Sequence, residues 1–186
     1  MKNAMIIVVV VLVLVVLMAI GTYNRLVNLD EGANTAWAQV ENVLQRRYDL
    51  IPNLVNTVKG YASHEKDLLE NIARLRSQWA EAQGSDAKAR TATEMESALA
   101  RLMVVVENYP ELKANQNFLA LQDELAGTEN RISVERGRFN DAVRAYNTAV
   151  RRFPANLVAG MLGFEGKRSY FEAAAGAEQA PTVNFD

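Results

Sequence analysis

The sequence of 186 residues contains no cysteine and only one histidine, and these two scarcities exclude several classes of protein. Without cysteine there are no disulfides, no thiolate metal sites and no cysteine nucleophile. One histidine is too few for a di-iron bundle with two Glu-x-x-His motifs, or for a zinc protease motif with two histidines. Gly-rich phosphate loops and the Gly-x-Ser-x-Gly elbow are also missing from the sequence. We therefore expect no metal, no cofactor and no enzymatic activity.

An excess of positive charge is also lacking. The sequence contains 20 Lys and Arg residues and 22 Asp and Glu residues, which gives a net charge of −2. A balance of this kind offers no electrostatic basis for binding nucleic acid, so we expect no nucleic-acid partner. The pair His64-Glu65 could suggest acid-base chemistry, but its place at an expected helix start favours a role for Glu65 at the helix dipole.

One long hydrophobic run is present, the 17 consecutive apolar residues Ala4–Ile20. A helix of this length reaches ~26 Å, close to the ~30 Å core of a bilayer. The alternative is a cleaved signal peptide, with Lys2 as its charged start and Ala19-Ile20-Gly21 as a small-residue cleavage site. We favour a retained transmembrane anchor over residues 1–22, because the run exceeds a typical signal-peptide core.

Strand-type alternation is absent from the remaining sequence, whereas seven-residue spacing is clear. Seam positions, all but one of them apolar, recur at alternating steps of four and three, which predicts one long helix from about Tyr23 to Tyr61 that continues through Pro52. The positions are Ala33, Trp37, Val40, Leu44, Arg47, Ile51, Leu54, Val58 and Tyr61.

Three further amphipathic stretches follow, and the last is the longest. Residues 68–82 predict a second helix with Ser63 as its N-cap, and residues 92–109 a third with Ser85 or Asp86 as its N-cap and Pro110 as its end. The fourth helix is expected over residues 118–153, because its spacing persists for five heptads before Pro154. The predicted fold class is all-α: a single transmembrane helix, then an antiparallel four-helix bundle over residues 23–153 with coiled-coil packing and long first and fourth helices.

Charged residues interrupt these apolar seams. Arg47 lies in the first helix and Glu129 and Arg136 lie in the fourth, at positions where leucine or isoleucine is usual. A buried unpaired charge costs several kcal/mol, so we expect these groups to pair with one another or with Glu107 and Asn140. We interpret the five residues as a structural buried polar layer. A ligand or metal site in the bundle core is the alternative.

Glycines interrupt the apolar residues that follow Pro154. Residues 154–172 predict a short apolar helical segment, which either lies on the bundle or presents an interaction surface of Leu157, Met161, Leu162 and Phe164 to a partner or to lipid. Residues 173–186 read as an extended C-terminal tail.

Several motifs resemble the LemA family of bacterial membrane proteins, and the resemblance covers nearly the whole chain. They are Ala36-Trp37, the run from Arg47 to Val55, Val58-Lys59-Gly60-Tyr61, the run from Glu107 to Asn115, the run from Thr128 to Ile132, Phe139-Asn140, Tyr146-Asn147 and Phe153-Pro154. The stretch from about Ala80 to Ala92 departs from the pattern. The resemblance implies an N-terminal membrane helix followed by a helical bundle, with no nameable enzymatic activity.

We therefore expect a membrane-anchored scaffold or adaptor whose partners are the lipid bilayer and either further copies of the chain or another membrane protein. A membrane-remodelling oligomer and a ligand-sensing bundle are the alternatives. The expected location is the bacterial cytoplasmic membrane, with a single pass. The flanking charges Lys2 and Arg25 do not decide which side the bundle occupies, and the extracytoplasmic side is preferred.

Overall fold

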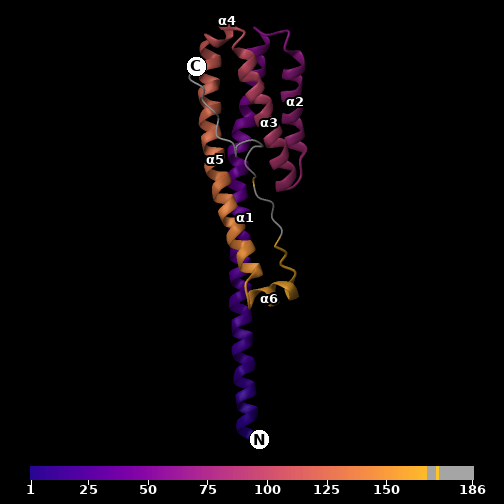
Figure 1. The fold of residues 1–186 in the computed structure, drawn as a ribbon, viewed down its shortest axis with the longest axis vertical. Helices are drawn as coiled ribbons and strands as arrows, with labels where there is room; N and C mark the ends of the chain where they lie inside the picture. The colour runs from indigo at the N-terminus through magenta and orange to yellow at the C-terminus, as the bar shows by residue number, and fades with distance from the viewer. Residues whose placement is uncertain (167–170, 172–186) are drawn as a thin grey trace, which may run out of the picture. The chain divides into compact units, whose positions relative to one another are not determined.

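The chain is helical, as its sequence predicts. Within residues 1–166 and 171, which the computed structural model describes, there are helices and no strands. The helices are α1 (Lys2–Lys59), α2 (Lys66–Glu81), α3 (Ser85–Val106), α4 (Pro110–Lys113), α5 (Gln116–Arg151) and α6 (Ala155–Leu162) (Figure 1). The segments Lys167–Tyr170 and Glu172–Asp186, which include the predicted tail, lie outside the described residues.

Helix α1 is longer than either of the two helices that the sequence predicts for its range. Its 58 residues include both the apolar run and the amphipathic helix expected from Tyr23. Only Gly21 and Thr22 separate these two stretches, and a single helical glycine costs no more than about 1 kcal/mol, so nothing ends the helix there. The predicted continuation through Pro52 is confirmed.

Proline 52 removes one backbone hydrogen bond from α1, and a side chain of α2 replaces it. Proline has no N–H to donate to the carbonyl four residues earlier, which is that of Tyr48. The Nε of Arg76 donates to this carbonyl at 3.2 Å. The interruption in α1 is therefore matched by a contact from α2.

Burial follows the predicted seven-residue spacing in both long helices. The residues buried at this interval are Leu26, Ala33, Val40, Arg47 and Leu54 in α1, and Phe118, Leu125, Ile132, Phe139 and Tyr146 in α5. Trp37 departs from the expectation because it is only half-buried. Its ring meets that of Phe139 edge to face, with centroids 5.5 Å apart.

The helix ends differ from the sequence-based expectations. The N-cap of α2 is Glu65 and that of α3 is Gly84, so Ser63, Ser85 and Asp86 are not N-caps. Gly84 has φ = 80°, a conformation that costs glycine little and other residues more. Helix α3 ends at Val106, and Pro110 begins the short helix α4 instead of closing the third helix. Proline suits a first helical position because the N–H there has no intrahelical partner.

The chain divides into two compact units. The first comprises Met1–Val40 and Val134–Tyr170, and its apolar cluster joins α1, α5 and α6 through Leu26, Tyr146, Ala149, Val150 and Ala159. The second contains Glu41–Ser133, within which α2 and α3 lie side by side (Figure 1). Its fully buried side chains include Tyr48, Ile51, Leu54, Ile72, Leu75, Met95, Leu102, Leu112, Phe118 and Ile132.

Candidate functional site

The apolar run at the start of α1 is exposed along nearly its whole length. Side chains from Met5 to Met18 are between 51 and 65 % exposed. By length and composition α1 is able to cross a membrane, and the apolar window is not buried inside the structure. Exposing so many large aliphatic side chains to water is unfavourable, at roughly 25 cal/mol per Å² of apolar surface. A lipid phase removes this cost.

Two of the five residues of the predicted polar layer meet in the second unit. The Nη1 of Arg47 donates to the Oε2 of Glu129 at 2.5 Å. The Arg47 side chain is 8 % exposed, whereas that of Glu129 is 35 % exposed. The pair links α1 to α5 and supplies a countercharge to a buried guanidinium.

The other three residues lie elsewhere. Arg136 and Asn140 belong to the first unit, where each is half-buried. Glu107 is exposed beyond the end of α3 and forms an ion pair with Lys113 at 2.6 Å. The prediction that Glu107 lies in a buried layer was therefore wrong. Helix α3 ends one residue before Glu107, so the helical spacing no longer turns this side chain toward the core.

A group of contacts around Trp79 was not predicted from the sequence. The Trp79 and Tyr48 rings stack with centroids 4.4 Å apart, and the Nζ of Lys88 lies 5.0 Å from the Trp79 centroid. Lys88 also forms an ion pair with Glu41. These contacts link α1, α2 and α3. Spacing along one helix could not reveal them, because it does not specify which neighbours lie across the seam.

The His64-Glu65 pair contributes a structural contact. Glu65 accepts a hydrogen bond from the Tyr109 hydroxyl at 3.1 Å, which ties the start of α2 to the segment after α3. His64 is exposed in the turn between α1 and α2. No cluster of three or more potential metal ligands occurs among the residues that the structure describes.

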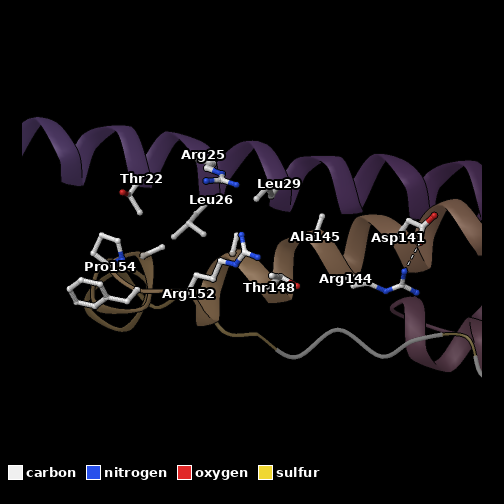
Figure 2. A pocket seen from close by; sticks show the side chains of 13 residues that line it. Thr22, Arg25, Leu26, Leu29, Asp141, Arg144, Ala145, Thr148, Arg152 and Pro154 are labelled. Atoms are coloured by element: carbon white, nitrogen blue, oxygen red, sulfur yellow. Dashed lines mark hydrogen bonds and ion pairs between the residues drawn. The ribbon is translucent and has the colours of Figure 1, made fainter.

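The first unit contains a pocket between α1, α5 and the start of α6 (Figure 2). Its cavity volume is about 610 Å³. Three arginines and one aspartate contribute charge, and two threonines together with aliphatic and aromatic side chains complete the wall. The lining residues are Thr22, Arg25, Leu26, Leu29, Asp141, Arg144, Ala145, Thr148, Ala149, Arg152, Phe153, Pro154 and Ala155.

The predicted interaction surface after Pro154 is divided by the packing of α6. Ala159 and Phe164 pack inward, and the Phe164 ring meets Tyr23 edge to face at 5.7 Å. Phe164 is half-buried, so it is not part of an exposed surface. The other three predicted residues are exposed: Leu157 by 58 %, Met161 by 86 % and Leu162 by 55 %. Phe153, just before α6, is 80 % exposed.

Comparison with known proteins gives one family and several relatives. The LemA family pattern matches residues 36–185. The magnetosome protein MamQ of Magnetospirillum gryphiswaldense is 26 % identical over 180 residues, a match that covers 83 % of this chain and 66 % of MamQ. Protein LemA of Metamycoplasma hominis is 22 % identical over 141 residues, covering 75 % of this chain and 64 % of that protein. The chain thus spans slightly less than two thirds of either relative.

Proposed function

The chain belongs to the LemA family, and we propose that it is a non-catalytic scaffold, anchored in the membrane by α1, that acts through protein–protein contacts. The observation that carries the proposal is the unbroken α1, whose apolar run from Met5 to Met18 is exposed and whose later part has a buried heptad seam. An anchor continuous with a packed helix is suited to hold a binding surface near a bilayer. Tethering also raises the local concentration of partners, so that weak contacts become effective.

We further propose that α2, α3 and the adjoining parts of α1 and α5 form an antiparallel four-helix bundle in the second unit. The ion pair between Arg47 and Glu129 and the shared core of the unit support this arrangement. A bundle of this kind leaves the outer faces of its helices available for contacts. Val104 in α3, at 71 % exposed, and Leu119 in α5, at 44 %, are apolar residues on such faces.

Site-specific photocrosslinking of the full chain in native membranes tests the scaffold role. A photoreactive residue is placed at Val104 or Leu119, and a control is placed at Ile72, which is fully buried. We expect an adduct of defined mass from the exposed sites, with either a second copy or one membrane protein, and only intramolecular products from Ile72. The adduct should elute at fixed stoichiometry after detergent extraction. Labelling of lipid alone from both exposed sites would contradict the proposal.

Sizing and electron microscopy of the purified chain separate the scaffold from a membrane-remodelling oligomer. A monodisperse monomer or dimer supports the adaptor. Rings, cages or filaments support remodelling, because long helices on an anchor are able to assemble edge to edge on a bilayer.

A ligand-sensing bundle is the second candidate, and the Arg47 guanidinium favours it. Its Nε is buried and has no hydrogen-bond partner among the residues that the structure describes. A small polar ligand would satisfy this donor. A thermal shift on addition of a metabolite panel, lost in Glu129→Gln, would support sensing. An unchanged melting temperature across the panel would contradict it.

We also propose the bacterial cytoplasmic membrane as the location, with the helical part on the extracytoplasmic side. The absence of cysteine makes this directly testable. A single Ser63→Cys substitution in the exposed turn before α2 should react with a membrane-impermeant maleimide in intact spheroplasts. Labelling only after lysis would place the helical part in the cytoplasm.

A further inference from the structure

The pocket of the first unit lies immediately after the apolar run of α1. Ile20 ends the run, and Thr22 and Arg25 line the pocket. At a rise of ~1.5 Å per residue, Arg25 lies about 8 Å beyond the last apolar residue along the helix. The headgroup layer on each side of a bilayer is roughly 5–7 Å thick. A membrane that covers the apolar run therefore brings its headgroups to the pocket.

The charges in the pocket are suited to a phosphate. Arg25, Arg144 and Arg152 are opposed by a single acid, Asp141, which pairs with Arg144 at 3.2 Å. Among the described residues, no carboxylate lies within 4.0 Å of Arg25 or Arg152. Figure 2 shows Arg25 on α1 and the Arg152 side chain, from the residue just after the end of α5, extending toward α1. Guanidinium groups bind phosphate oxygens through paired hydrogen bonds, so Arg25 on α1 and Arg152 just after α5, neither paired with an acid, favour an anionic occupant.

Apolar side chains in and beside the pocket favour a lipid over a soluble phosphate as its occupant. Leu26, Leu29 and Ala149 form part of the wall. Phe153 also lines the pocket while remaining 80 % exposed, and the nearby α6 exposes Leu157 and Met161. Free phosphate leaves this apolar surface in water. A phospholipid covers it with its glycerol backbone and upper acyl chains, as occurs for apolar side chains at membrane interfaces.

We propose that this pocket binds an anionic phospholipid, with Arg25 and Arg152 holding the phosphate and with Phe153 and the exposed face of α6 contacting the acyl region. The inference rests on the proposed anchoring of the chain through α1. It adds a lipid-selective site to that anchor, so the protein would discriminate between membranes of different headgroup charge.

Native mass spectrometry of the full chain, released from nanodiscs containing phosphatidylglycerol and phosphatidylcholine, tests the proposal. We expect retained phosphatidylglycerol and little phosphatidylcholine. The variants Arg25→Gln and Arg152→Gln should each weaken retention on the order of tenfold, as expected for loss of a charged hydrogen-bonding group. Arg151→Gln is the matched control. It removes the same charge one residue away, from an exposed position outside the pocket lining, and retention should be unchanged.

Four results would overturn the proposal. Equal losses in Arg151→Gln and Arg152→Gln would mean diffuse attraction to an anionic surface. Displacement of the lipid by equimolar glycerol 3-phosphate or inorganic phosphate would identify a soluble phosphate as the occupant. Flotation with phosphatidylcholine vesicles but no selective phosphatidylglycerol retention would reject the pocket while leaving the anchor intact. Failure to float with any vesicle would instead reject the anchor, and the lipid site with it.

Discussion

Neighbouring charged residues of α1 differ in their surroundings, and the surroundings determine how much each ion pair should stabilise the protein. Arg47 is buried against Glu129, whereas Arg46, next to it in the sequence, pairs with Glu124 at 3.7 Å in a largely exposed position. An exposed ion pair is worth ~0–1 kcal/mol, while a buried guanidinium that loses its partner costs considerably more. Glu124 and Glu129, both in α5, thus allow the stabilisation by an exposed ion pair to be compared with that by a buried one.

Replacing Glu129 should destabilise the protein more than replacing Glu124. We expect Glu129→Gln to lower the free energy of unfolding by about 1–3 kcal/mol, because it leaves a buried charge without its countercharge. Glu124→Gln, the same change on the same helix, should cost less than about 1 kcal/mol. Urea denaturation followed by circular dichroism measures both values. Equal effects would mean that the Arg47 pair contributes no more than a surface contact.

Tyr109 couples stability to alkaline pH. Loss of solvent around its hydroxyl, followed by its hydrogen bond to Glu65 and the negative charge of that carboxylate, raises the pKa of Tyr109 above its ordinary value of 10.0. The folded state therefore holds this proton more tightly than the unfolded state. The resulting stabilisation is complete below pH 10 and is lost as pH rises through the folded pKa.

The pH dependence of stability above pH 10 should become shallower in Tyr109→Phe. The wild type loses the contribution of the bound phenol proton in this window, whereas phenylalanine has no proton to lose. Urea midpoints measured from pH 8 to pH 11 for both proteins test this, with Glu65→Gln as a second variant that should also flatten the profile. Parallel profiles for wild type and Tyr109→Phe would show that the hydrogen bond to Glu65 does not persist in solution.

Among the helices, α1 shows how a local defect is offset by a neighbour. Pro52 deprives the Tyr48 carbonyl of its usual partner, and Arg76 of α2 donates to that carbonyl. A carbonyl left without a donor costs about 1–3 kcal/mol when buried. The contact between Arg76 and the Tyr48 carbonyl is therefore expected to stabilise the protein only while residue 52 is proline.

A double-mutant cycle tests this dependence. Arg76→Ala should lower the free energy of unfolding by about 1 kcal/mol in the wild type. In the Pro52→Ala background the cost should largely vanish, because the new N–H at residue 52 is able to bond the Tyr48 carbonyl. Chemical denaturation of the four proteins gives the coupling energy. A coupling of zero would indicate that Arg76 acts through its charge or packing and not through this carbonyl.

The sequence predicts helices well where a long periodic seam exists, and poorly where the structure depends on contacts between helices. The seams of α1 and α5, and even the passage through Pro52, follow from spacing alone. The N-caps are Glu65 and Gly84 instead of the expected residues, because several residues near each helix start could serve and the seam spacing does not choose among them. The pocket was not predicted, because its arginines come from α1, from α5 and from the turn after α5, which are far apart in sequence and brought together only by packing.

For the whole molecule, the state of the first 21 residues decides whether the chain is anchored. The apolar run has the length of a spanning helix, and α1 continues past the alternative cleavage site at Gly21. We expect the intact mass of protein extracted from membranes to include residues 1–21. A mature chain that begins near Thr22 would show that the run is a signal peptide.

Because α1 is continuous at Gly21, the apolar run and the pocket residues of α1 have a fixed rotation relative to each other about the helix axis. Each residue inserted into an α-helix turns everything beyond it by about 100° and lifts it by ~1.5 Å. One to four alanines added after Ile20 would therefore turn Arg25 and Leu26 through about a full circle around the axis while raising them only ~6 Å from the bilayer.

If only the depth of the pocket relative to the bilayer matters, lipid retention should fall smoothly as one to four alanines are added. If a partner contacts both the apolar run and the pocket region, crosslinking to that partner should instead oscillate and recover near the fourth alanine. In that case the membrane-spanning part of α1 would set both the rotation of the pocket about the helix axis and its height above the bilayer.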